Sequence, residues 1–273
     1  ACGFHAGDPM IMQATVAAAA RSGRAGTVDE LQIRGPGRRA GQAVSGSIPA
    51  HLLGVAPRRR IGLLGGSFNP AHEGHLEIAL IALKRLALDE IWFLVSPGNP
   101  LKSTAGMDAL ASRAASVQQV VGSHPRLRVV TIEAALGTRY TADTLAALGR
   151  RFRRTRFVWL MGADNLIQIP AWARWTTIFR SVPVAVFARP GYSVKALAGK
   201  AARRFRCARR RDSHSRALPA MRAPAWVFFH SRLNPASASA IREARARSLA
   251  AQAAAPAAAS LPAGGQHSAP STP

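Results

Sequence analysis

Short apolar runs alternate with longer amphipathic stretches between residues 60 and 229. The apolar runs predict six strands, at residues 61–64, 90–95, 127–132, 157–161, 182–187 and 226–229. Apolar positions three or four residues apart predict a helix from Glu73 or Gly74, others over 107–121 and 141–152, and a Trp-rich one ending at Ile178. This alternation is typical of an α/β protein with a parallel sheet and helices on both of its faces.

The rest of the chain differs in composition. Residues 1–59 lack sustained periodicity, and we expect a disordered extension or a mis-annotated start; a basic targeting or RNA-binding arm is the alternative. The predicted domain covers residues 60–247, and within it 195–222 form a basic insertion with ten basic residues and one acidic residue. We expect that insertion to be solvated and partly disordered. Residues 248–273 predict a disordered tail rich in Ala and Pro.

The segment after the first strand carries the strongest chemical signal. A Gly-rich turn between a buried strand and a helix start offers main-chain amides to an anion, above all phosphate. His72 and His75 are three residues apart, so both are expected to face that anion. Each imidazole can donate a hydrogen bond to phosphate, and as imidazolium it would add positive charge. Structural or solvated histidines, or a metal pair, are the alternatives, but HExxH, the Walker pattern and GxGxxG are all absent.

Other polar segments also follow predicted strands. Because ligands of parallel sheets bind outside the carboxyl ends of the strands, these segments are expected to converge on one cleft. The segments are Gly65–His75, Ser96–Lys102, Gly162–Trp172 and Arg189.

Four motifs resemble one enzyme family. GGSFNPAHEGH at 65–75 is similar to the signature of the adenylyl- and cytidylyltransferase superfamily, and its GGSFNP form resembles bacterial nicotinate-nucleotide adenylyltransferases. RYTADTL at 139–145, GADNLIQIPAWARW at 162–175 and ARPGY at 188–192 extend the resemblance. Residues 235–242 match a late ATP-phosphate motif less closely, with Ser239 where that family has Thr. The resemblance implies a Rossmann-like nucleotidyltransferase fold and adenylyl transfer from ATP to nicotinate mononucleotide, with Mg²⁺ accompanying ATP.

The resemblance also implies roles for individual residues. His72 and His75 would be catalytic. ATP would be bound by Gly65, Gly66, Ser67, Phe68, Ser237, Ser239 and Arg242. The mononucleotide would be bound by Asn69, Lys102, Tyr140, Thr141, Asp164, Trp172 and Arg189.

Several of these residues have a plainer interpretation. Trp172 can stack on a pyridine ring, but a core tryptophan at helical spacing with Trp175 is the alternative. Asp164 can accept a hydrogen bond from a ribose hydroxyl or cap the following helix. Lys102 and Arg189 either neutralise phosphate or are solvated charges.

The charge is extreme but uneven. The 273 residues carry a formal net charge of +24, and residues 191–273 alone hold 14 basic and 2 acidic residues. Such an excess favours nucleic acid, an acidic membrane surface or small anionic substrates. Because Arg and Ala dominate, a GC-rich genome accounts for it equally well, and no basic stripe interleaved with aromatics indicates nucleic-acid stacking.

Two cysteines, Cys2 and Cys207, suggest a reducing, cytoplasmic setting, and no signal peptide or membrane span is predicted. Two rivals to the nicotinate enzyme stay open. One is a related adenylyltransferase for nicotinamide mononucleotide or phosphopantetheine, and the other is a basic nucleic-acid-binding protein without catalysis.

Overall fold

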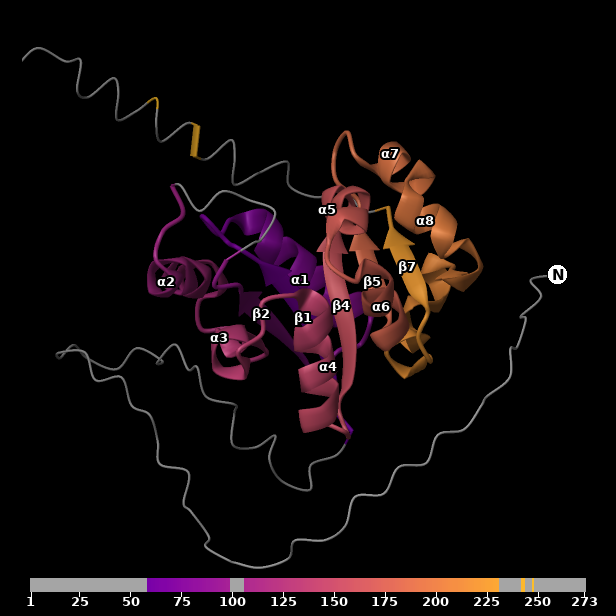
Figure 1. Cartoon of the computed structure of the whole chain (residues 1–273), viewed down its shortest axis with the longest axis horizontal. Helices are drawn as coiled ribbons and strands as arrows, with labels where there is room; N and C mark the ends of the chain where they lie inside the picture. Colours follow the sequence, from indigo (N-terminus) through magenta and orange to yellow (C-terminus); the bar gives the residue numbers. More distant parts are fainter. Residues whose placement is uncertain (1–57, 99–105, 231–241, 244–246, 248–273) are drawn as a thin grey trace, which may run out of the picture. The chain divides into compact units, whose positions relative to one another are not determined.

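The computed structural model describes residues 58–98, 106–230, 242, 243 and 247. Its centre is a seven-stranded sheet with the order β3-β2-β1-β4-β5-β7-β6 (Figure 1). The strands are β1 (Arg60–Gly66), β2 (Glu90–Val95), β3 (Leu127–Val130), β4 (Arg156–Gly162), β5 (Val184–Phe187), β6 (Arg209–Arg210) and β7 (Trp226–Phe229). All neighbouring strands are parallel, as predicted.

The strand order determines where a ligand can bind. The chain runs outward from β1 through β2 to β3, and then returns to place β4 on the other side of β1. The crossovers on the two sides of β1 and β4 therefore diverge, and a crevice opens outside the carboxyl ends of these two strands. Every residue of β2 is buried, as expected for a central strand covered on both faces.

Helices cover both faces of the sheet. They are α1 (Glu73–Arg85), α2 (Leu110–Val121), α3 (Ile132–Leu136), α4 (Thr141–Arg151), α5 (Ala163–Gln168), η2 (Ile169–Ala171), α6 (Trp175–Ser181), α7 (Ser193–Ala198), α8 (Lys200–Arg204), η3 (Arg206–Ala208) and η4 (Asp212–Ala220). Buried residues of α1, α2 and η4 form one core with one face of the sheet, and those of α4 to α8 form a second core with the other face. Figure 1 shows α2 and α3 toward the β2 side of the sheet, and α7 and α8 toward the β7 side.

The predicted α/β architecture is confirmed, with local corrections. The strand predicted over 127–132 ends at Val130, because Ile132 begins the short helix α3, which Gly137 ends in the left-handed conformation. The helix predicted over 107–121 begins only at Leu110, and the strand predicted over 182–187 begins at Val184. The remaining predicted strands and helices have close counterparts.

The basic run 195–222 differs most from expectation. We expected it to be partly disordered, but it folds into α7, α8, η3, β6 and η4. Phe205, Leu218 and several alanines of this run are buried, whereas its arginines at 203, 204, 206, 209, 210 and 211 are exposed. Apolar side chains between the arginines therefore pack this segment against the rest of the domain. The prediction of disorder was wrong because it relied on the high charge of the run and overlooked these apolar residues.

No helix in the described part of the chain combines the length and apolar character needed to cross a bilayer. The predictions for residues 1–57 and for the tail at 248–273 fall outside the described residues.

Gly65 has a packing role at the end of β1. A Cβ atom at this position would lie 2.3 Å from the far edge of the Trp159 ring, which reaches across from β4. Because the Trp159 side chain is only 2% exposed, the ring has little room to move away. The residue at 65 must therefore lack a side chain for the two strands to pack as they do.

We predict that Gly65→Ala destabilises the protein through this clash, by about 1–3 kcal/mol of unfolding free energy. Urea denaturation followed by circular dichroism measures the change. Gly149→Ala is the matched control, because nothing lies within 4 Å of its Cβ position in α4. That control should be neutral or stabilising, since Ala favours helix over Gly. Equal stability of the Gly65 variant and the wild type would contradict the packing role.

Candidate active site

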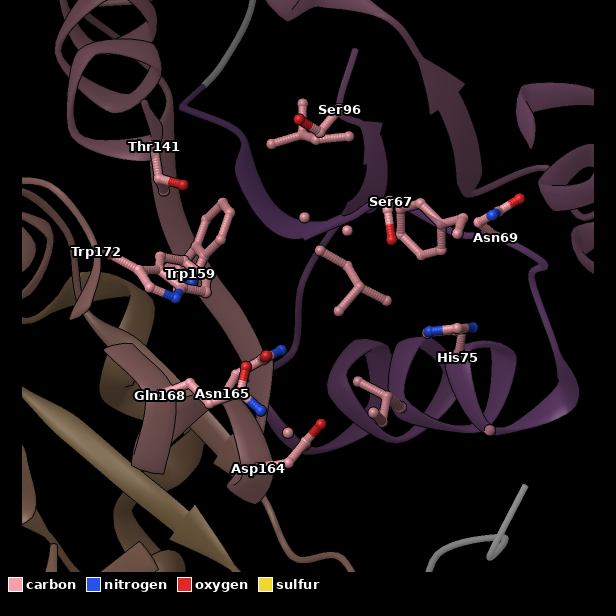
Figure 2. A pocket seen from close by; sticks show the side chains of 18 of the residues that line it. Ser67, Asn69, His75, Ser96, Thr141, Trp159, Asp164, Asn165, Gln168 and Trp172 are labelled. Atoms are coloured by element: carbon pink, nitrogen blue, oxygen red, sulfur yellow. The ribbon is translucent and has the colours of Figure 1, made fainter. Parts of the chain in front are cut away.

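A cleft of about 620 Å³ lies at the carboxyl ends of the central strands. Its wall comes from the segments that follow β1, β2, β4 and β5, together with the start of α4 and Arg242. Figure 2 shows Ser67, Asn69 and His75 on one side of this cleft, with Thr141, Trp159 and Trp172 on the opposite side. The convergence expected from the strand pattern is therefore present.

The turn between β1 and α1 is held from several directions. Phe68 adopts a left-handed backbone conformation (φ 47°), which is strained for a residue with a side chain, and its ring is buried at 3% exposure. The Asn69 side chain donates to Gly106 O at 3.0 Å and accepts from Asp108 N at 3.3 Å. Arg242 donates to Asn69 O at 2.5 Å. Burial and these contacts offset the strain and fix the turn.

His72 and His75 face each other at the start of α1. Their ring centroids are 3.8 Å apart with an angle of 30° between the planes, and the Phe68 ring packs edge-on against His75 at 4.9 Å. The backbone N–H of His72 donates to Nδ1 of His75 at 3.2 Å. Since Nδ1 accepts this bond, the proton of a neutral His75 ring resides on Nε2. His75 can therefore present an Nε2–H donor to a ligand.

Both rings are neutral at pH 7. Burial, followed by the positive charge of Arg189, lowers the pKa of His72 to about 4, although the carboxylate of Asp164 opposes these effects. Burial, followed by His72 and Arg189, lowers the pKa of His75 to about 3. The imidazolium form considered in the sequence analysis is therefore wrong for the free protein, in which each neutral ring has one N–H group that can donate a hydrogen bond.

Asp164 and Arg189 form an ion pair within the cleft. Arg189 Nη1 lies 2.8 Å from Asp164 Oδ2, and both side chains are mostly buried. A Cβ at position 162 would lie 2.4 Å from Asp164 Oδ1, so Gly162 leaves space for this carboxylate. The N-cap of α5 is Gly162, not Asp164, which removes the helix-capping interpretation of Asp164.

Trp172 and Trp175 have separate environments. Trp172 lies between η2 and α6 in an extended conformation and lines the cleft, although part of it packs against the core. Trp175 instead meets Phe179 and Phe205 edge-on, with centroids 6.4 and 5.9 Å away. The two tryptophans therefore do not share one helix, because Trp172 precedes α6, although both are partly buried against the same core.

The structure brings most of the predicted site residues to this cleft. Those that line it are Gly65, Gly66, Ser67, Phe68, Asn69, His72, His75, Tyr140, Thr141, Asp164, Trp172, Arg189 and Arg242. Lys102, Ser237 and Ser239 fall outside the described residues. The ligand contacts assigned to all of these residues remain predictions.

Sequence reasoning missed several residues of the site. Trp159 lines the cleft, but it lies within an apolar strand, where the sequence pattern predicts a buried core residue. Glu133 also lines it, accepts a hydrogen bond from Thr144 at 3.1 Å, and has a pKa raised by burial. Arg139, Asn165 and Gln168 lie within the quoted motifs, so attention to every polar position in those motifs would have found them.

Within the described ranges, no three His, Cys, Asp or Glu side chains gather in a way that would hold a metal ion.

The parallel sheet, the switch between β1 and β4 and the histidine pair at the turn define a nucleotidyltransferase-type α/β protein. A family model of cytidylyltransferase-like proteins matches residues 63–244. A second family model, LamB/YcsF, matches only residues 1–29, outside the described part of the chain.

Curated relatives narrow the class. A probable nicotinate-nucleotide adenylyltransferase of Parvibaculum lavamentivorans is 52% identical over 189 residues, covering 69% of this chain and 94% of the relative. A probable nicotinate-nucleotide adenylyltransferase of Bradyrhizobium sp. is 52% identical over 169 residues, covering 62% of this chain and 88% of the relative. The chain therefore belongs to the nicotinate-nucleotide adenylyltransferase family.

Solved structures support the fold. The Plasmodium falciparum nicotinic acid mononucleotide adenylyltransferase complexed with NaAD has a TM-score of 0.51 and 14% identity, covering 68% of this chain and 83% of that one. At this identity the likeness concerns the fold alone.

We predict that His72 makes stability depend on pH. Because its pKa is about 4 in the folded protein and near 6.5 in the unfolded chain, the unfolded chain binds the proton more readily. The stabilisation is complete above pH 6.5 and is lost as the pH falls toward 4. Between pH 7 and pH 5, the wild type should lose about 2 kcal/mol more unfolding free energy than His72→Asn. Urea denaturation at both pH values measures this difference, and equal losses would contradict the neutral buried ring.

Proposed function

We propose that this protein transfers the adenylyl group of ATP to nicotinate mononucleotide, giving nicotinate adenine dinucleotide and pyrophosphate, in the biosynthesis of NAD. The observation that carries the proposal is the histidine pair, with rings 3.8 Å apart, at a helix start within a cleft of about 620 Å³. Membership of the nicotinate-nucleotide adenylyltransferase family supports the same reaction.

The chemistry requires positioning and charge stabilisation. An oxygen of the acceptor's 5′-phosphate forms a bond with the α-phosphorus of ATP, and the bond from that phosphorus to the bridging oxygen breaks. Pyrophosphate leaves with the bonding electron pair. A phosphate monoester has its second pKa near 6, so the attacking oxygen is already ionised at neutral pH and needs no general base. The protein therefore has to align the two substrates and stabilise the developing charge.

The neutral imidazoles suit this task. The Nε2–H of His75 would donate to an α-phosphate oxygen, where negative charge increases in the transition state. His72 stacks on the His75 ring and would meet the neighbouring phosphates. Main-chain amides of the Gly66–Phe68 turn would bind further oxygens. Mg²⁺, when bound with ATP, would neutralise part of the triphosphate charge.

The opposite side of the cleft suits the acceptor. Trp172 would stack on the pyridine ring, and the main-chain amides at Tyr140 and Thr141, at the start of the 11-residue helix α4, would bind the nicotinate carboxylate. Asp164 would accept a hydrogen bond from a ribose hydroxyl, while Arg189, which already pairs with Asp164, would approach phosphate. Lys102, Ser237, Ser239 and Arg242 would add phosphate contacts.

Pyrophosphate release in the presence of ATP and each candidate acceptor tests the substrate assignment. We expect the largest kcat/KM with nicotinate mononucleotide. Faster turnover with nicotinamide mononucleotide or phosphopantetheine would favour the related enzymes. An absence of turnover with all three, with RNA binding that persists in about 0.2 M salt, would favour the nucleic-acid-binding alternative, because purely electrostatic binding weakens steeply with salt.

We predict that His75→Ala lowers kcat by about 10²- to 10³-fold, the usual effect of removing one donor to a developing oxyanion. Stopped assays of pyrophosphate release provide the measurement. His214→Ala serves as the control, because His214 is exposed on η4 and does not line the cleft. Wild-type turnover of the His75 variant would remove His75 from the mechanism.

We also predict that Trp172→Ala raises the KM for the mononucleotide about 10- to 100-fold, because a large stacking surface is lost. The KM for ATP should change by less than about threefold, because binding energy is lost only on the acceptor side. Trp175→Ala is the comparison: its ring packs on Phe179 and Phe205, so it should reduce stability and leave both KM values nearly unchanged. A Trp172 variant with unchanged KM for the mononucleotide would refute stacking.

A further inference from the structure

Arg113 is a buried cation directly behind the cleft. It lies in the first turn of α2 with an exposed fraction of 2%, and it does not line the cleft itself. Its guanidinium donates to four main-chain carbonyls. These are Asp108 O at 2.9 Å, Ser67 O at 2.7 Å, Ser96 O at 2.7 Å and Pro97 O at 3.2 Å. A rigid fork of five N–H groups makes such multiple contacts, which a lysine ammonium with its three donors and different shape does not reproduce.

Three of these carbonyls belong to two other loops, whereas Asp108 O lies just ahead of α2 itself. Ser67 lies in the turn between β1 and α1, whereas Ser96 and Pro97 follow β2. Ser67 and Ser96 both line the cleft, so a single side chain connects two parts of its wall. Burying a cation is unfavourable unless its hydrogen bonds are made, and here four of the five donors have carbonyl partners.

The direction of these carbonyls has a consequence for the amides. In a planar trans peptide unit, C=O and N–H point in opposite directions. Ser67 O points toward Arg113, so the N–H of Phe68, in the same peptide unit, points away from Arg113. Pro97 O also points toward Arg113, so the N–H of Gly98 points away as well. Phe68 and Gly98 line the cleft, while Arg113 lies behind the wall. Both amides are therefore directed toward the ligand side.

We propose that Arg113 is a positioning residue, which aims the Phe68 and Gly98 amides at substrate phosphate oxygens by holding the two loops from behind. This inference rests on the proposed adenylyl transfer for its substrates. Arg113 touches no substrate itself. Its positive charge, a short distance behind the turn, also favours phosphate in the cleft.

The test uses Arg113→Ala, Arg113→Lys and the control Arg126→Ala in the full-length protein. Arg126 donates to a single carbonyl, Leu88 O at 3.1 Å, ahead of β2 and so at the other end of the sheet. For each variant, circular dichroism gives the folded fraction, pyrophosphate release gives kcat and KM, and calorimetry with α,β-methylene-ATP and Mg²⁺ gives the affinity for the nucleotide. The kinetics are repeated with millimolar guanidinium or methylammonium.

Corrected for its folded fraction, Arg113→Ala should lose about 10- to 100-fold in kcat, the range expected when an oriented donor is misplaced. Its affinity for the ATP analogue should fall about tenfold. Guanidinium should restore at least part of kcat, methylammonium should not, and Arg126→Ala should match the wild type throughout. Arg113→Lys keeps the positive charge but should still have a kcat about tenfold below that of the wild type. If the Ala variant does not fold, the kcat of the Lys variant tests the proposal.

Full activity and affinity of folded Arg113→Lys would overturn the proposal. So would losses that follow the unfolded fraction alone, or a folded Ala variant that guanidinium does not rescue. If the wild type releases no pyrophosphate with any acceptor, the proposed function fails instead, and the fall in affinity for the ATP analogue still tests Arg113.

Discussion

One backbone hydrogen bond organises the chemistry of this site. The N–H of His72 donates to Nδ1 of His75, so the His75 ring has a fixed orientation and tautomer before any ligand arrives. Stacking by His72 and the edge of Phe68 hold the same ring in place. Burial then keeps both imidazoles neutral, so that the site offers a preoriented donor with no charge to neutralise when substrate is absent. Such preorganisation is what stabilises a developing oxyanion most effectively.

The fold surrounds the histidine pair with other segments that line the same cleft. The carboxyl ends of β1, β2, β4 and β5 open toward the same cleft, where the turn faces Trp172 and the start of α4. Close packing behind the wall of the cleft holds these segments in place. Gly65 admits the Trp159 ring, Gly162 admits the Asp164 carboxylate, and Arg113 links the loops after β1 and β2. The site therefore depends on small residues and on a buried arginine as much as on its polar lining.

Periodicity predicted the sheet well, because parallel strands are continuous apolar runs and the helices between them are amphipathic. It failed where local and tertiary effects compete. The β-branched residues before Ile132 suggested a longer strand, and arginines concealed the buried alanines, Phe205 and Leu218 of the basic run. The GGSFNPAHEGH motif predicted the position of the histidine pair. It could not predict that both rings are neutral, because their pKa values are lowered mainly by burial in the folded protein. Trp159 and Arg113 could not be found in this way, because their roles come from contacts across 94 and 46 residues of sequence, to Gly65 and Ser67.

Nitrogen-15 NMR of the histidine side chains tests the central claim most directly. Spectra recorded from pH 7 to pH 3, with His72→Asn and His75→Gln used for assignment, report both the tautomer and the pKa of each ring. The account predicts that His75 is neutral at pH 7 with its proton on Nε2, and that it titrates only near pH 3. A His75 ring that titrates near 6.5, or that carries its proton on Nδ1 at neutral pH, would contradict the account.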